Sequence, residues 1–212
     1  ITNLSEQAKK DSNIIGQFGV GFYSVFMVAD EVRIRTKSHK KGEPAYEWHS
    51  DGTGKYFLNP IEKENRGTEI IVHLKDEEKE YTEKARIESI IKKYSNFVSF
   101  PIIVCGEREN QITAIWKETK KEIKEEQYNE FYKFISNTED TPLFRLHTSA
   151  EAPIQFSSIL YCPSTNYETY KFKKLEHGVH LYSNKILIQS DCKLLLPEYL
   201  RFIHGVVDSS DI

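Results

Sequence analysis

The residues with the clearest potential for chemistry lie between Ile15 and Ser24, where the chain reads Gly-Gln-Phe-Gly-Val-Gly-Phe-Tyr-Ser after the isoleucine. Glycines leave no side chain between backbone N–H groups and a ligand. The first N–H groups of a helix have no partner inside the helix, and they lie at the positive end of its dipole. The segment could therefore bind a phosphate group. The alternative is a helix start packed closely on a sheet.

Two other phosphate motifs fit this segment poorly. A P-loop needs lysine and then serine or threonine after its last glycine, whereas Phe22 and Tyr23 follow Gly21. A dinucleotide-binding motif needs a strand before the glycines and parallel βαβ topology after them. The residues before Gly16 are polar, and the later strands are predicted to be antiparallel.

The elements that would position this segment follow from the periodicity of the apolar residues. Helical spacing predicts a helix over 22–29, and a second helical stripe predicts one over 82–98. Alternation between short turns predicts an antiparallel meander. Its expected strands are 32–36, 46–48, 56–58 and 68–74, and a short strand over 102–105 follows the second helix. Residues 1–106 thus form a two-layer α+β pattern.

A change of composition predicts a domain boundary at 107–127, which is rich in Glu, Lys and Gln. After it, Tyr128, Phe131, Tyr132 and Ile135 form the apolar face of one helix. The remaining segments alternate between strand patterns and one short helix. The expected strands are 144–147, 154–161, 179–182, 186–189 and 205–208, and the short helix is 197–203.

Composition excludes several classes of protein. The formal net charge of −3 gives no electrostatic case for nucleic acid as a partner. No apolar stretch is long enough for a membrane span. Cys105, Cys162 and Cys192 are odd in number and lack Cys-x-x-Cys spacing, which favours a reducing compartment and three buried thiols.

The glycine segment, followed by Met-Val-Ala-Asp over 27–30, resembles the third nucleotide-binding motif of the heat-shock protein 90 chaperones. This family belongs to the GHKL class of ATPases. Further segments resemble the same family, so that the resemblance covers essentially the whole chain. They are 67–70, 93–101, 130–133, 181–183 and 200–209.

The resemblance implies an incomplete two-layer α/β sandwich of the GHKL type, followed by an incomplete α/β middle domain. Residues 1–106 would be the C-terminal part of the N-terminal ATP-binding domain, with 1–15 in the ATP lid. Residues 107–127 would be a short linker and the start of the middle domain. Residues 128–212 would be a truncated middle domain that binds clients and couples to the ATPase.

The resemblance also implies the ligand and its contacts. Thr68 would hydrogen-bond the adenine of ATP through its hydroxyl. The Mg²⁺ ligand and the catalytic glutamate are expected before Ile1, and the catalytic arginine just past Ile212. The fragment alone is therefore expected to be inactive. The residues expected to close over the ATP phosphates are Gly16, Gln17, Phe18, Gly19, Val20, Gly21 and Phe22.

The parent protein would be an ATP-dependent chaperone and ATP hydrolase that acts on client proteins as a homodimer. Three segments resemble the mitochondrial branch of the family more closely than the others: 114–116, 181–189 and 201–208. This resemblance implies the mitochondrial matrix as the location, with the cytoplasm as the alternative. His204 differs from the basic residue usual at its position. Two other functions stay open: a GHKL relative such as a type II topoisomerase subunit, or a non-catalytic interaction segment.

Three further features favour structural roles. His177 and His180 could suggest a metal, but a strand places such residues on opposite faces. Residues 117–126 are charged and predict a solvated face or linker. A third feature is a cluster of aromatic residues near lysines, made of Tyr167, Tyr170 and Phe172. The resemblance places this region on the client-facing side of the middle domain. The alternative is a helix packed on its own core.

Overall fold

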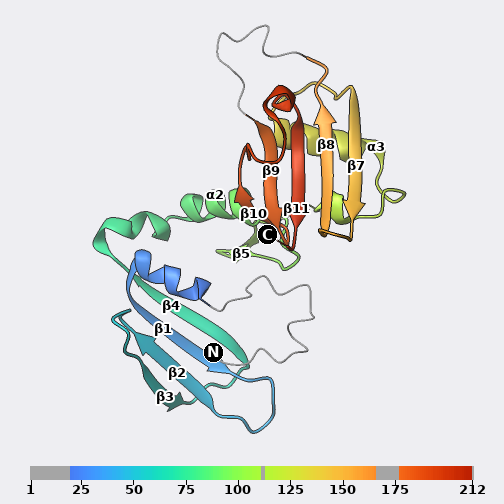
Figure 1. Ribbon diagram of the computed structural model, residues 1–212. Coiled ribbons are helices and arrows are strands. Elements are labelled where there is room, and N and C mark those ends of the chain that lie inside the picture. Colours follow the sequence, from blue (N-terminus) through green and yellow to red (C-terminus); the bar gives the residue numbers. More distant parts are fainter. Residues whose placement is uncertain (1–19, 111–112, 166–176, 212) are drawn as a thin grey trace. The chain divides into compact units, whose positions relative to one another are not determined.

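The computed structural model describes residues 20–110, 113–165 and 177–211, which divide into two units (Figure 1). Within the described residues, unit 1 runs as far as Ile87 and unit 2 starts at Glu88. Three sheets and several helices give the mixed α+β composition predicted from the sequence. The assignment of functional domains to 1–106 and 128–212 stays a prediction.

Unit 1 is built around a four-stranded antiparallel sheet with the strand order β3-β2-β1-β4. The expected meander holds for its first three strands, but β4 pairs with β1 instead of β3. In the following list η denotes a 3₁₀ helix. The elements are η1 (Gly21–Met27), β1 (Ala29–Lys37), β2 (Ala45–Ser50), β3 (Phe57–Ile61), β4 (Gly67–Leu74), η2 (Asp76–Thr82) and the start of α2 (Lys84–Tyr94).

The two faces of this sheet differ in chemistry because side chains alternate along each strand. The register pairs Ile34 with Trp48 and Ile70, and it pairs Trp48 with Leu58. These four residues therefore form an apolar row across one face. The other face carries ion pairs such as Arg35 with Glu47, whose atoms Nε and Oε2 lie 2.7 Å apart.

Both predicted helices of the first half are shorter than expected. The helix expected over 22–29 is a 3₁₀ helix, because its hydrogen bonds, such as Tyr23 N–H to Val20 O, span three residues. It ends at Met27. Ala29 already pairs with Leu74 in the sheet. The helix predicted over 82–98 ends at Tyr94, and the following Phe97 is buried in the core of unit 2.

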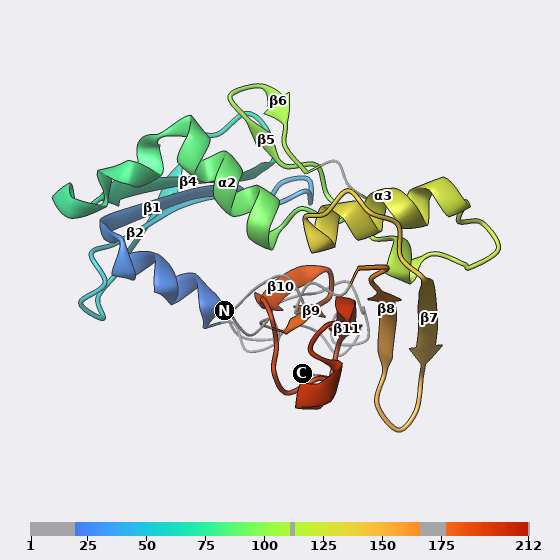
Figure 2. The same cartoon turned by 90° about the horizontal axis from the view of Figure 1, so that it is seen from above.

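Unit 2 contains a five-stranded mixed sheet with the order β10-β9-β11-β8-β7. Strand β11 runs parallel to β9 and antiparallel to β8. Helix α3 lies across one face of this sheet (Figure 2). The elements after α2 are β5 (Ile103–Val104), β6 (Glu107–Arg108), η3 (Ile115–Lys117), α3 (Glu125–Ser136), β7 (Phe144–Ala150), β8 (Phe156–Cys162), β9 (Gly178–Ser183), β10 (Ile186–Gln189), η5 (Glu198–Leu200) and β11 (His204–Ser209).

The core of unit 2 forms where α3 meets the sheet. The predicted apolar face is confirmed, since Tyr128, Phe131 and Tyr132 are buried. Trp116 also lies in this core, 1% exposed, with its ring centroid 4.6 Å from that of Phe97. Part of the segment expected to act as a linker therefore belongs to the core.

The cysteines differ in burial although we expected three buried thiols. Cys192 is buried and Cys162 is half-buried, but Cys105 is exposed. Cys105 has φ +49° and Gly106 has φ +89°, so these two residues form the turn between β5 and β6. A tight turn places its side chains outside the sheet, which explains the exposed thiol. No helix in the described ranges is long and apolar enough to cross a membrane.

Candidate functional site

The glycine segment is described only at its C-terminal end. Gly16, Gln17, Phe18 and Gly19 lie outside the described residues. Val20 caps η1 and is 64% exposed, and Gly21 opens the helix. A Cβ atom placed on Gly21 would meet no atom of the described residues within 4 Å. Close packing on the described sheet therefore does not account for glycine at this position.

A cavity of about 540 Å³ adjoins this helix in unit 1. Phe22 lines it together with Trp48, and their rings meet edge to face with centroids 5.8 Å apart. Trp48 also stacks on Tyr56 at 6.4 Å. The volume is in the range of small-molecule sites, which are mostly apolar with a few polar groups. The other lining residues are Tyr23, Phe26, Ile34, Ser50, Gly52, Gly54, Lys55 and Leu58.

Thr68 lies on the same face of the sheet as this cavity. It is the partner of Thr36 across β1 and β4, two residues along from the pair Ile34 and Ile70. The two threonine hydroxyl oxygens lie 2.8 Å apart and form a hydrogen bond. A hydroxyl donates one hydrogen bond and accepts up to two, so Thr68 keeps capacity for a ligand. Thr68 does not itself line the cavity.

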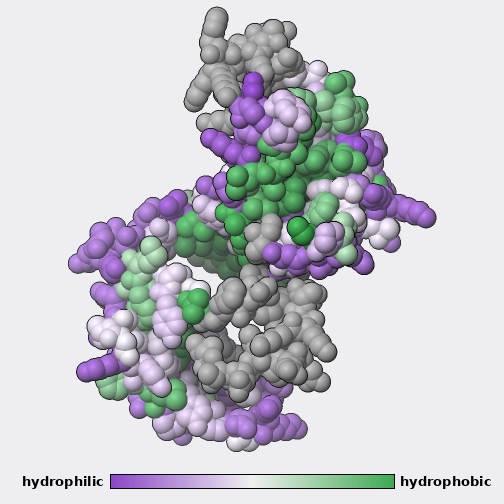
Figure 3. Space-filling model, viewed as in Figure 1, coloured by the Kyte–Doolittle hydropathy of each residue, from purple (hydrophilic) through white to green (hydrophobic). Residues whose placement is uncertain are grey.

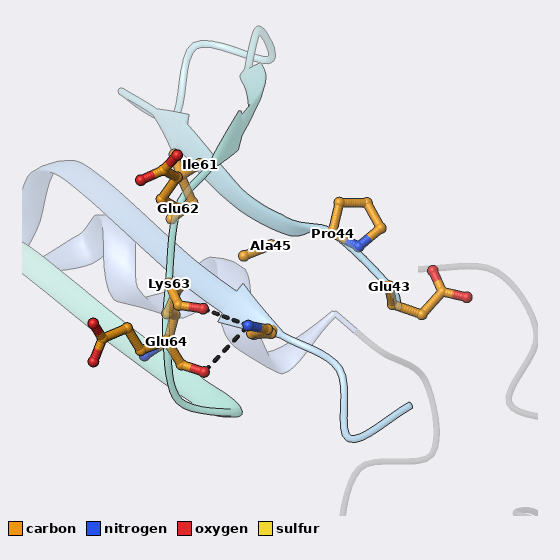
Figure 4. A pocket seen from close by; sticks show the side chains of 8 residues that line it. Glu43, Pro44, Ala45, Ile61, Glu62, Lys63 and Glu64 are labelled. Carbon is orange, nitrogen blue, oxygen red and sulfur yellow. Dashed lines mark hydrogen bonds between the residues drawn. The ribbon is translucent and has the colours of Figure 1, made fainter. Parts of the chain in front are cut away.

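A second hollow of unit 1, about 570 Å³, contains none of the predicted site residues (Figure 4). It lies between the start of β2 and the end of β3. The ammonium group of Lys37 donates to the carbonyls of Lys63 at 2.6 Å and Glu64 at 3.1 Å, drawn as dashed lines. Glu43, Glu62 and Glu64 add carboxylates. Three glutamates outnumber the two lysines of the lining, and the Lys37 ammonium is already bound by carbonyls, so this hollow is a poor site for a phosphate.

One acidic group in unit 2 could in principle hold a cation. Among the described residues, Glu88, Glu107 and Glu109 are the only three potential ligands whose oxygens lie within 4.8 Å of one another. The ammonium of Lys92 lies 3.7 Å from Glu109 and offsets part of this charge. Sequence reasoning missed the group because Glu88 lies in α2, Glu107 in β6 and Glu109 just after β6.

The two histidines considered for a metal have separate partners. His177 Nε2 lies 3.4 Å from a carboxylate oxygen of Glu198, whereas His180 Nδ1 accepts a hydrogen bond from the N–H of Asp191. His177 precedes β9, which begins at Gly178, so only His180 lies in the strand. Tyr167, Tyr170 and Phe172 lie outside the described residues.

Comparison with known proteins identifies the family. Residues 106–212 match the family model described as Hsp90 protein. The chain belongs to the Hsp90 family. It is 47% identical to a chaperone protein HtpG of Desulfotalea psychrophila over 209 residues, which are 99% of this chain and 33% of the relative. It is 50% identical to the mitochondrial TNF receptor-associated protein 1 homolog of Dictyostelium discoideum over 212 residues, which are 100% of this chain and 30% of the relative.

Membership of the Hsp90 family decides against a type II topoisomerase subunit. The chain spans about a third of the length of the curated relatives it matches. Bacterial and mitochondrial relatives are similarly close: the HtpG of Chlorobium luteolum is also 50% identical, over 98% of this chain and 34% of its own length. The comparison therefore does not distinguish the mitochondrial branch from the bacterial one.

Proposed function

We propose that this chain is part of an ATP-dependent molecular chaperone that binds unfolded or partly folded client proteins and assists their folding. The observation that carries this proposal is the near-50% identity over the whole chain to proteins named as chaperones. The parent protein would be an ATP hydrolase that works as a homodimer. Within it, 1–106 would complete the ATP-binding domain and 128–212 would begin the middle domain, with 107–127 between them.

The proposed nucleotide site uses the glycine segment for phosphate and Thr68 for adenine. Gly16 through Phe22 would present backbone N–H groups to the phosphates, as a glycine-rich helix start can. Two observations support this assignment. Within the described residues no atom lies within 4 Å of a Cβ placed on Gly21, and Phe22 borders a cavity on the face of the sheet that carries Thr68. A client protein, not a nucleic acid, would be the macromolecular partner.

Mg²⁺ would accompany ATP and offset the charge that develops on the phosphates during hydrolysis. The proposed phosphate segment, Gly16 to Phe22, has no carboxylate or carboxamide besides Gln17. Oxygen ligands of that type are what Mg²⁺ prefers. The magnesium ligand and the catalytic groups would thus come from other parts of the parent protein. We propose the mitochondrial matrix as its location, with the cytoplasm as the alternative.

The threonine pair offers a matched test in the full-length parent protein. Thr68→Val removes the proposed adenine contact and the bond to Thr36, whereas Thr36→Val removes only that bond. We expect Thr68→Val to weaken ATP binding about tenfold, equivalent to about 1.4 kcal/mol. Thr36→Val should change the affinity less than about twofold. Calorimetry with ATP and Mg²⁺ measures both. Equal losses in the two variants would show that Thr68 acts through its neighbour and not on the nucleotide.

A further inference from the structure

The ring of His180 on β9 accepts a backbone hydrogen bond. Its Nδ1 accepts the backbone N–H of Asp191 at 3.2 Å. The backbone carbonyl of Ile135, in the last turn of α3, acts on the same ring and opposes the lowering of its pKa by burial. Because Nδ1 accepts a hydrogen bond, the neutral ring of His180 carries its proton on Nε2.

The ring of His180 thereby joins the sheet to two elements that end in left-handed backbone. Helix α3 ends at Asn137 with φ +52°, and Asp191 follows β10 with φ +51°. The next N–H, that of Cys192, donates to the Val179 carbonyl on β9 at 2.8 Å. A left-handed conformation is unfavourable for residues other than glycine, so local hydrogen bonds must hold it. His180 supplies one of them at Asp191.

A second histidine, half-buried like the first, lies beside it. His204 on the parallel strand β11 pairs with Gly178, and a Cβ on that glycine would come within 2.5 Å of the His204 ring nitrogen Nδ1. The ring of His204 thus packs against the backbone of β9. Burial lowers the pKa of His180 and of His204, and the proximity of His180 lowers the pKa of His204 further.

Within the described part of the chain, the other titratable groups around the pair are two carboxylates and a phenol. Asp191 acts on both histidines and Asp140, in the loop after α3, acts on His204; both oppose the lowered pKa values. Asp140 accepts hydrogen bonds from the hydroxyls of Tyr132, Thr138 and Ser164. Tyr161 on β8 pairs with His204 across the sheet. Helix α3 contributes the Ile135 carbonyl.

We propose that His180 is a pH-sensitive switch. While its ring is neutral, His180 holds the end of α3 and the turn at Asp191 against β9, and protonation at Nδ1 releases that turn. A proton on Nδ1 would turn the acceptor into a donor that faces the N–H of Asp191. The Asp191 carboxylate lies 3.9 Å from Nδ1. That distance is too long for a hydrogen bond, so the carboxylate can accept from the Nδ1–H group only if the turn rearranges. This inference is independent of the proposed nucleotide site.

The direction of the pH effect follows from the lowered pKa of His180. The unfolded chain, with the ordinary histidine value of 6.5, binds its proton at higher pH than the folded chain does. The contribution of His180 to the free energy of unfolding is therefore greatest above pH 6.5, and it falls as pH drops toward the folded pKa. The folding constant can fall by at most about tenfold per pH unit for each such histidine. His147 has a lowered pKa as well, so the test must be local.

Amide exchange at Asp191 in the 212-residue chain provides that local test. NMR or mass spectrometry would follow it from pH 7.5 to pH 5.0, after correction for intrinsic exchange. In the wild type we expect protection at Asp191 and Cys192 to fall about tenfold or more as His180 titrates. His180→Gln keeps a donor but cannot titrate, so its Asp191 amide should be weakly protected at every pH. The matched variant His147→Gln should behave as the wild type at Asp191.

Imidazole NMR of the wild type gives a second readout that needs no variant to fold. Long-range proton–nitrogen spectra should show the proton of His180 on Nε2 at pH 7.5 and a titration midpoint below 6.5. The proposal is overturned if Nδ1 carries the proton at neutral pH. It is equally overturned if Asp191 stays fully protected while His180 becomes charged.

Discussion

Replacement of Asp208 tests the polar contacts that organise the core of unit 2. Asp208 lies on β11 with 0% of its surface exposed. Its Oδ2 accepts hydrogen bonds from Trp116 Nε1 at 2.8 Å and from the backbone N–H of Lys185 at 3.0 Å. Its Oδ1 has no hydrogen-bond partner among the described residues, and the Lys117 ammonium lies 3.4 Å from it as an ion pair. One carboxylate therefore holds η3 and the β9–β10 turn to β11.

The expected cost of Asp208→Ala follows from the groups that it leaves behind. Two N–H groups lose their acceptor, and each such loss in a buried site costs about 1–3 kcal/mol. The Lys117 side chain is 30% exposed and can turn toward water, which limits the cost of its lost partner. Removing one member of a buried ion pair generally costs about 3–5 kcal/mol. We therefore expect unit 2 to lose about 3–5 kcal/mol in its free energy of unfolding.

Urea unfolding of the 212-residue chain measures this loss. A Trp48→Phe background leaves Trp116 as the only tryptophan, so that its fluorescence reports on unit 2. Asp208→Asn keeps one acceptor oxygen and should cost less than alanine. Asp211→Ala is the matched control: it removes an exposed hydrogen bond to the N–H of Gln155 and should cost about 1 kcal/mol. An Asp208→Ala loss no greater than the Asp211→Ala loss would refute the reasoning.

Three further predictions address packing, ionisation and reactivity. Gly205→Ala would place a Cβ 2.3 Å from the Ile159 carbonyl oxygen, so calorimetry should show a free energy of unfolding lowered by at least about 2 kcal/mol. Burial raises the pKa of Tyr182 to about 12. Its neutral form therefore stabilises the fold below pH 10, and the free energy of unfolding, measured with urea, should fall as pH rises from 10 toward 12, before the Tyr182 phenolate absorbs in the folded chain. A chromogenic disulfide reagent should modify the exposed Cys105 in seconds to minutes and Cys192 only on unfolding.

The strands could be predicted from the sequence because their signal is local. Val32, Ile34 and Thr36 alternate with charged residues, and the structure places all three in β1. The partner of a strand is set by contacts far away in the chain. Nothing in residues 67–74 alone indicates that β4 pairs with β1 and not with its neighbour β3. Register and strand order are therefore the parts that the sequence left open.

The candidate site shows the same division between local and distant information. The glycine segment could be recognised as a candidate phosphate site from its composition, and Thr68 as a candidate adenine contact from the resemblance to the family. The cavity beside them also depends on Trp48 and Tyr56, which come from β2 and the loop after it. The contact between Trp48 and Phe22 required the fold of the sheet and of η1 to be known. Phe22 as an apolar residue at helical spacing gave the only advance signal.

Segment 96–110 shows why composition and packing place a boundary at different residues. Composition changes after residue 106, where charged side chains become frequent. Packing changes earlier, because the ring of Phe97 meets those of Trp116 and Tyr182 at 4.6 and 5.6 Å. Asn110 is fully buried and its side chain bonds to the backbone of Ile102, Val98 and Phe100. The β5–β6 hairpin is thereby tied at its base, and a cut at residue 106 would divide it between its two strands. The smallest stable form of unit 2 therefore has to begin before Phe97.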